Sequence, residues 1–299
     1  MRTATITACT VLALLVPGAV FAGDAGPGFA ASQKSFIKTL FSGKKHFDCI
    51  AETRRLLHHA PEAGNRADFD YFIAANYYLG GQYATAASLT EAPPAGEADG
   101  RSRVLRAQCL SKLSRHEDAL AELERVPGDA ANPFRRYDIF LRKSDALLSL
   151  ERYDGILRAI DAERKFYAGS PRLAEFRRDA ERYAKFRNAD PARAALLSAV
   201  LPGAGQAYAG KYLDAFISLT AVAGAGFGAW HFHSRGENGL AYTLSFFTAL
   251  FYGGNIYGAW NSAAGANAAE RARFASGLRE KYIAPYDPLK FTEIPGVLP

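Results

Sequence analysis

Cysteine is scarce in this chain of 299 residues, which holds three, and methionine occurs once. Cys9 lies in the amino-terminal segment, so Cys49 and Cys109 are the two thiols in the remainder. The repeat pattern described below separates these two by two structural units, which is farther than disulfide geometry allows. We therefore expect two buried small side chains and not a disulfide-stapled fold.

Neither sign of charge dominates the sequence. There are 36 Lys and Arg residues against 30 Asp and Glu, a formal net charge of +6. The basic residues are spread along the chain, whereas a nucleic-acid-binding domain gathers a clear excess on one face. The composition therefore predicts no nucleic-acid partner.

Recognisable catalytic constellations are also lacking. No Ser/His/Asp spacing and no nucleophile elbow stands out. His231, His233 and Glu237 provide no closed set of metal ligands, and the nearby carboxylates Glu122 and Glu124 are expected on a solvated helix surface. The sequence predicts no enzyme, no metal site and no other cofactor.

A phosphate-binding loop is suggested by spacing alone at residues 205–211, which read GQAYAGK. Such a loop needs Ser or Thr after its lysine, to hold magnesium, and a strand before it in an α/β sheet. Here Tyr212 follows Lys211, and no α/β pattern accompanies the match. A nucleotide site is therefore not expected.

The first residues have the three parts of a secretory signal peptide. One basic residue, Arg2, precedes an apolar stretch at 9–16, and a small-x-small exit ends at Ala22. We predict a signal peptide at residues 1–22 and export in a bacterium. An uncleaved anchor is the alternative.

From residue 32 to about 187 apolar residues recur three and four positions apart, as in helices. An aromatic residue or histidine follows a short polar turn at Phe47, Tyr83, His116 and Tyr153, separated by 36, 33 and 37 residues. Small or aliphatic pairs follow each of them three and four positions later. This period predicts stacked helix-turn-helix repeats.

The stretch FIAANYYLGGQYATAASL, residues 72–89, resembles a tetratricopeptide repeat (TPR), and residues 101–126 match next best. The resemblance implies a TPR-like α-solenoid over residues 32–190 whose groove binds an extended peptide or a helix of a protein partner. The groove positions carried over by register are Tyr71, Tyr78, Gln108 and Asp145. Ordinary solvated helix surface is the alternative for each of them. A basic amphipathic helix at 171–187 is expected to cap the solenoid.

Two long apolar segments follow, at 213–230 and 240–260, joined by a short polar turn. Each has about the length that crosses ~30 Å of hydrocarbon at roughly 1.5 Å per residue. They predict a transmembrane helical hairpin within residues 191–262. A hairpin buried in a soluble core is the alternative.

The segments LPGAGQAYAGKYLDA and YGGNIYGAWNSA resemble the start and end of small two-helix membrane domains of the TM2 family. The resemblance covers about 70 residues and implies a membrane location. Glycines would permit a tight interfacial bend, and Gln206 and Tyr208 would satisfy exposed backbone or lipid headgroups. The expected turn residues are Pro202, Gly203, Gly205, Gln206, Tyr208 and Gly210.

Small residues at a spacing of four predict close helix packing in lipid, and a polar residue there needs a partner inside the bundle. These helix-packing candidates are Gly224, Gly228, Gly254, Asn255 and Gly258. They leave a homo-oligomer possible. Residues 263–299 are expected to form a basic amphipathic helix and tail, either lying along anionic headgroups or solvated.

Together these patterns predict an all-α protein: a TPR-like α-solenoid, a transmembrane hairpin and an amphipathic carboxyl-terminal helix. The expected function is a membrane-anchored periplasmic scaffold or adaptor in the bacterial inner membrane, with the repeats in the periplasm. The alternative is a small oligomeric membrane module that aids insertion or transport, with regulatory repeats. The positive-inside rule disfavours this topology, because Arg271, Arg273, Arg279 and Lys281 follow the second segment.

Overall fold

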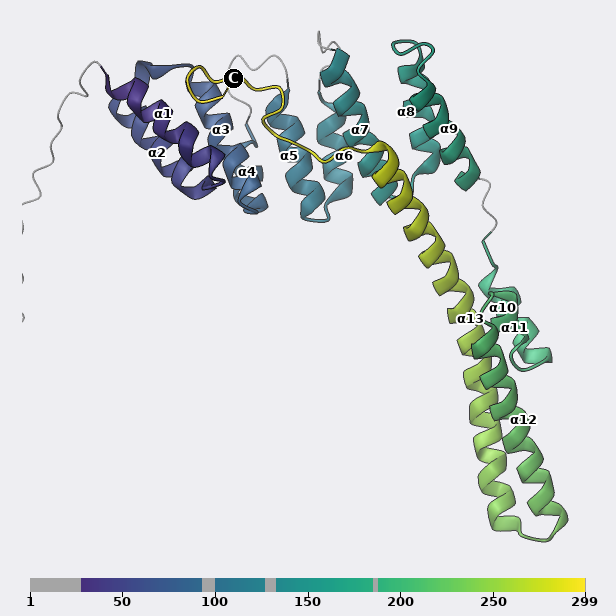
Figure 1. Cartoon of the computed structure of the whole chain (residues 1–299). Helices are drawn as coiled ribbons and strands as arrows, with labels where there is room; N and C mark the ends of the chain where they lie inside the picture. The colour runs from purple at the N-terminus through teal and green to yellow at the C-terminus, as the bar shows by residue number, and fades with distance from the viewer. Residues whose placement is uncertain (1–27, 93–99, 127–132, 185–187, 299) are drawn as a thin grey trace, which may run out of the picture. The chain divides into compact units, whose positions relative to one another are not determined.

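The computed structural model describes residues 28–92, 100–126, 133–184 and 188–298. Helices dominate these residues, and the β structure among them is an isolated bridge between Ile294 and Leu298 (Figure 1). The predicted all-α fold is confirmed for this part of the chain. The predicted signal peptide at 1–22 lies outside the described residues.

By internal contacts the chain divides into two compact units. The first joins Met1–Gly80 with Thr292–Pro299, and the second is Gly81–Phe291. The carboxyl-terminal segment is therefore divided between the units. Residues up to Phe291 belong to the second unit, and residues from Thr292 belong to the first. Each unit has a core of its own and is described by itself.

The first unit is a small helical bundle. Ile37, Cys49 and Phe72 are fully buried in it, and Phe69 is nearly so. Asn65 caps its last helix through the amide of Ala67 at 2.9 Å, a favourable use of Asn at this position. Its elements are α1 (Phe29–Ser42), α2 (His46–His59), the 3₁₀ helix η1 (Pro61–Ala63) and α3 (Arg66–Leu79).

The second unit begins with further helices that pack in sequence order. They are α4 (Tyr83–Leu89), α5 (Arg101–Lys112), α6 (His116–Glu124), α7 (Pro133–Ser149), α8 (Tyr153–Arg164) and α9 (Pro171–Ala184). Leu173 and Phe176 of α9 are buried in the same cluster as Phe140 of α7. The apolar face of α9 therefore packs on the preceding helices, and residues 185–187 of the predicted helix lie outside the described residues.

One turn geometry recurs four times along the helices α1–α8. Lys44, Gly81, Ser114 and Glu151 all have left-handed backbone, with φ of 55°, 80°, 61° and 55°. They are separated by 37, 33 and 37 residues, and a helix begins two residues after each of them. A left-handed residue after a helix end satisfies its last carbonyl groups and reverses the chain. The period therefore reflects a repeated turn, with His46 rather than Phe47 at the first helix start.

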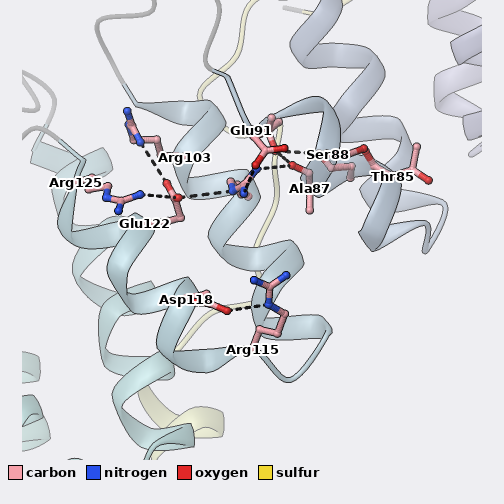
Figure 2. A network of polar contacts seen from close by, with 12 residues as sticks. Thr85, Ala87, Ser88, Glu91, Arg103, Arg115, Asp118, Glu122 and Arg125 are labelled. Atoms are coloured by element: carbon pink, nitrogen blue, oxygen red, sulfur yellow. Dashed lines mark hydrogen bonds and ion pairs between the residues drawn. The ribbon is translucent and has the colours of Figure 1, made fainter.

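Glu122 of α6 joins α5 and α6, contrary to the expectation of a solvated carboxylate (Figure 2). Its side chain is 12% exposed. It forms ion pairs with Arg103 at 3.3 Å, Arg106 at 3.6 Å and Arg125 at 3.1 Å. Three arginines are needed because a carboxylate withdrawn from water is stable only when its oxygens are paired. Glu124 is exposed, as expected.

The last helices of the second unit are α10 (Pro191–Val200), α11 (Ala204–Tyr208), α12 (Tyr212–Ser234) and α13 (Asn238–Tyr282). α12 and α13 lie side by side (Figure 1). α13 contains both the second apolar segment and most of the predicted amphipathic helix. The boundary expected at residue 263 therefore falls inside one uninterrupted helix. Alanine-rich sequence without proline around that position explains the continuity.

The carboxyl-terminal half of α13 packs against α7 and α9. Tyr282 stacks on Phe176 with ring centroids 4.5 Å apart, and Phe274 stacks on Tyr183 at 4.3 Å. Such aromatic pairs contribute about 0.5–1.5 kcal/mol each beyond their buried area. This half of α13 is therefore part of the core around α9.

The basic residues of this half are paired within the protein. Arg279 donates to Asp145 at 2.6 Å, and Lys281 pairs with Glu175 at 2.7 Å and with Asp179 at 2.9 Å. Their carboxylate partners lie on α7 and α9, more than a hundred residues earlier in the chain. Contact of this helix with headgroups stays a prediction.

Candidate functional site

A buried polar cluster lies where α10 and α11 meet the two long helices. α10 packs against α13, and α11 contacts both α12 and α13. Ser198, Gln206 and Asn255 are 0%, 2% and 4% exposed at this junction. We call these three side chains the polar cluster. Burial of three polar side chains is unfavourable unless every group finds a hydrogen-bond partner.

The glycines before and within α11 are required by close backbone approach. Gly203 has φ of 88°, and a Cβ atom there would lie 2.3 Å from the carbonyl oxygen of Ala215. A Cβ atom on Gly205 would lie 1.9 Å from the carbonyl oxygen of Ala194 and 2.7 Å from the Cβ of Ala259. Only glycine fits at either position without moving a neighbouring helix.

Asn255 of α13 bridges α10 and the glycine loop. Its Oδ1 accepts from the amide of Gly203 at 2.8 Å, and its Nδ2 donates to the carbonyl of Ser198 at 2.9 Å. The Oγ of Ser198 in turn accepts from the amide of Gly205 at 2.9 Å. Both amides in the loop therefore have acceptors within the protein.

Gln206 closes the cluster from α11. Its Oε1 accepts from the hydroxyl of Ser198 at 2.8 Å, and its Nε2 donates to the carbonyl of Asn255 at 3.0 Å. The same Nε2 lies 3.3 Å from the Oγ of Ser218 on α12. Gln206 thus connects four helices through one side chain.

This arrangement stabilises a helix junction, and it offers no phosphate cradle. The amides of Gly203 and Gly205 already donate to Asn255 and Ser198, whereas a phosphate loop presents such amides to its ligand. None of the three side chains in the polar cluster is ionisable. Among the described residues, no three His, Cys, Asp or Glu side chains gather closely enough to hold a metal ion.

Two further contacts fasten α10 to α13 beside the polar cluster. Asn267 accepts from the amide of Ala189 at 2.9 Å and donates to its carbonyl at 2.7 Å. The hydroxyl of Tyr252 donates to the carbonyl of Ala199. Sequence reasoning missed Ser198 and Asn267, because an isolated Ser or Asn in an alanine-rich helix gives no local signal of its distant partner.

The predicted turn residues fall into two groups. Gly203, Gly205 and Gln206 are buried, whereas Tyr208 and Gly210 are exposed and Pro202 is half-buried. The expectation that Gln206 faces exposed backbone or headgroups is wrong, because both ends of its side-chain amide form hydrogen bonds inside the polar cluster. The hydroxyl of Tyr208 accepts from the amide of Asp190 at 3.3 Å.

The predicted packing glycines also divide. Gly228 faces Leu244 of α13, with 3.0 Å available to a Cβ atom, and Gly258 faces Gln206 at 3.5 Å. No atom lies within 4 Å of the Cβ positions of Gly224 and Gly254. Gly224 and Gly254 therefore do not mediate the contact between α12 and α13 within one chain.

Large exposed apolar side chains concentrate on these last helices. Of the 27 in the described residues, 21 lie between Leu196 and Trp260. The most exposed of these 21 are Val200 at 87%, Tyr212 at 74%, Leu213 at 72% and Tyr257 at 70%. Continuous exposed apolar surface of this kind marks an interaction with lipid or protein.

One helix among those described, α12, is long and apolar enough to cross a membrane by length and composition. The second expected segment, residues 240–260, does not reach the same level. Its tyrosines, glycines and Asn255 lower its average hydropathy, although it carries no charge.

Three of the four predicted groove residues are buried rather than exposed. Tyr71, Tyr78 and Gln108 are 3%, 8% and 5% exposed, and the carboxylate of Asp145 accepts from Arg279. Asp145 is covered in part by α13, which carries its partner Arg279. As free groove surface these predictions are wrong.

No family model matches the chain, and no curated protein or solved structure is significantly similar to it.

Proposed function

We propose that this protein is a membrane-anchored scaffold. In this proposal the hairpin of α12 and α13 lies in a bacterial inner membrane, and the helices α1–α9 bind a protein partner in the periplasm. The apolar surface between Leu196 and Trp260 carries the proposal. Export rests on the signal-peptide pattern of residues 1–22.

Lipid is the cover that best suits this surface. Burying one large apolar side chain is worth about 1.5–3 kcal/mol, so 21 exposed side chains leave a large stabilisation unused in water. Helices satisfy their backbone groups internally, as a hydrocarbon environment requires. The polar cluster does the same for Ser198, Gln206 and Asn255, which would otherwise oppose insertion.

The part played by helices α1–α9 rests on their repeated turn and on the TPR resemblance. Stacked helix pairs of this kind present extended surfaces on which other chains bind. Catalysis is not part of the proposal, because the three side chains of the polar cluster are not ionisable and are hydrogen-bonded within the helix junction.

Membrane attachment is tested by washing membranes at alkaline pH and by fractionation. We expect the wild-type chain to stay in the membrane pellet, and a Phe216→Asp, Leu250→Asp variant to be lost from it. The matched control is Phe36→Asp, Phe47→Asp, which changes two exposed apolar residues of the first unit. Release of the wild-type chain by the wash would refute the proposal.

Sidedness is tested by protease treatment of intact cells, spheroplasts and lysed spheroplasts, with an epitope inserted near residue 96. Loss of the epitope in spheroplasts is the expected result. Protection until lysis would place the repeats in the cytoplasm and contradict export.

A second candidate function, a small oligomeric membrane module with regulatory repeats, is favoured by the open surface at Gly224 and Gly254. Small residues that face no helix of their own chain are available to a second copy. Cross-linking in membranes separates the two functions. The double variant Gly224→Leu, Gly254→Leu tests this. Loss of both the cross-linked dimer and the activity in cells would favour the oligomeric membrane module.

A further inference from the structure

The chain continues beyond α13 as an extended segment that contacts α7. Residues 283–287 form no helix, and a single turn follows at 288–291. The Nη2 of Arg142 on α7 donates to the carbonyl of Ala284 at 2.6 Å and to Asp138 at 3.2 Å. Arg142 is 2% exposed and Ala284 is exposed, so a buried guanidinium meets the segment at the protein surface.

Tyr286 is the side-chain anchor of the segment. It packs against a buried apolar cluster that includes Val104 and Ala107 of α5 and Ile139 of α7. Its ring centroid lies 5.6 Å from the guanidinium carbon of Arg142. Leu289, three residues later, is 9% exposed. An aromatic ring packed on an apolar cluster and a backbone hydrogen bond are usual elements by which a protein binds an extended peptide.

This contact leaves one buried donor unused. The Nε of Arg142 has no hydrogen-bond partner among the described residues. A buried N–H without an acceptor is unfavourable by about 1–3 kcal/mol, and more for a charged group. The carbonyl of Ala284 and the carboxylate of Asp138 both accept from Nη2 and leave Nε unpaired, whereas a carboxylate beside this edge of the guanidinium can accept from both nitrogens side by side.

We propose that the surface formed by Arg142 and the apolar cluster under Tyr286 is a peptide-binding site, and that residues 283–291 occupy it until a partner displaces them. The partner is an extended segment of another protein that has an acidic residue two positions before an aromatic one. The acidic residue pairs with Nη2 and Nε of Arg142, and the aromatic ring replaces Tyr286. This inference rests on the proposed scaffold function and specifies its partner.

The resident segment competes with a partner peptide for the same site, and this competition determines how much the affinity of the peptide rises when the segment is disabled. A segment tethered next to its own site acts at an effective concentration of about millimolar. A partner peptide therefore binds weakly to the intact chain and more strongly once the resident segment is disabled. The acidic residue supplies the extra affinity that a natural partner needs.

The test uses the purified full chain in micelles and a fluorescent peptide of residues 283–291, IAPYDPLKF. We expect the peptide to bind a Tyr286→Ala chain at least about 100-fold more tightly than the wild type. A peptide with Ala284→Asp is expected to bind that variant about 10-fold more tightly again. Adding Arg142→Gln to the chain should remove the advantage of the acidic peptide. Tyr257→Ala, which removes an exposed tyrosine of α13, is the matched control.

Equal binding to the wild-type and Tyr286→Ala chains would overturn the proposal, as would no binding to a Tyr286→Ala chain of unchanged thermal midpoint. If Tyr286→Ala fails to fold, Leu289→Ala decides, because it weakens the segment but keeps its main anchor. A Leu289→Ala chain that binds the peptide with an affinity between those expected for the wild-type and Tyr286→Ala chains supports the proposal. A Leu289→Ala chain that binds it with wild-type affinity refutes the proposal. Membrane attachment is measured separately by washing, so its failure is distinguishable from this one.

Discussion

The two halves of α13 have the same backbone and opposite surroundings. Residues 238–262 carry no charge and expose aromatic and aliphatic side chains such as Tyr242, Phe246 and Tyr257. Residues 263–282 carry several charges, yet Ala275, Leu278 and Tyr282 are buried against other helices. The difference shows that the formation of a helix and the surroundings that cover it are determined separately. Local propensity governs the first, and distant partners govern the second.

The largest expected effect lies at the junction that fixes the first half. Gly205→Ala places a Cβ atom 1.9 Å from a backbone oxygen of α10, so α10 or α13 must move. We expect a loss of stability of about 3 kcal/mol or more, the upper range for overpacking. Thermal unfolding in micelles, followed by circular dichroism, measures it.

Gly253→Ala is the control for this change, because no atom lies within 4 Å of its Cβ position. Alanine in that helical position is expected to be neutral or stabilising by about 0.5–1 kcal/mol. Equal behaviour of the two variants would show that the close approach at Gly205 does not hold the junction.

The next effect concerns Asn255, the polar residue of the uncharged half. Asn255→Leu leaves the amide of Gly203 and the carbonyl of Ser198 without their partner. We expect a loss of about 2–6 kcal/mol, since two buried groups remain unsatisfied at about 1–3 kcal/mol each. Asn261→Leu on the same helix is exposed and serves as the control. A Leu variant as stable as the wild type would contradict the role of the polar cluster.

In the charged half, Tyr282 gives a smaller and pH-dependent effect. Its hydroxyl donates to Asp179 at 2.6 Å. This bond, followed by the one from Lys281, holds the pKa of the Asp179 carboxyl below its usual range. A lowered folded-state pKa stabilises the protein above the ordinary pKa of about 4 and is lost as the pH falls through the folded value.

Tyr282→Phe is therefore expected to lose about 1 kcal/mol near pH 7, with the difference from the wild type closing below about pH 4. Unfolding in urea across this pH range measures it. Tyr257→Phe, in the uncharged half, should show no difference at any of these pH values. A constant difference down to pH 2 would mean that the hydroxyl acts independently of Asp179.

The smallest expected effect concerns the reaction of thiols with reagents, which shows whether protein or lipid excludes water from each region. Burial raises the pKa of the Cys49 thiol to about 11 and that of Cys109 to about 12. Both are free and covered by protein. We expect no labelling by a water-soluble thiol reagent at pH 8, in micelles or in vesicles, until the chain unfolds.

A thiol introduced by Phe216→Cys on α12 is covered only by lipid in our proposal. It should react with a lipid-soluble reagent and not with a water-soluble one in vesicles. Rapid reaction with the water-soluble reagent would show that this face of α12 lies in water.

Sequence reasoning succeeded where the signal is local. The all-α content and the period of the turns could be predicted from neighbouring residues, whereas the glycines at 203 and 205 were singled out through the resemblance to TM2 domains. It failed where the partner is remote. Arg279 pairs with Asp145, which is 134 residues away, and no pattern around either residue indicates the pair.

The burial of the groove residues could not be predicted either. Tyr71 and Gln108 have the register of surface positions, yet both are buried. The register describes one helix pair at a time and contains no information about what packs on that pair. For the polar cluster, Asn255 could be predicted to need a partner, but Ser198 could not be named as that partner.

The unbroken course of α13 also constrains the length of the chain. Each residue added to an α-helix turns everything after it by about 100° and advances it by about 1.5 Å. An insertion between residues 262 and 268 would therefore rotate Phe274, Arg279 and Tyr282 away from their partners while Asn255 stays in place. A seven-residue change nearly restores the rotation, within about 20°, but displaces the helix by about 10 Å. The number of residues between Asn255 and Phe274 is thus as much a part of the structure as their identity.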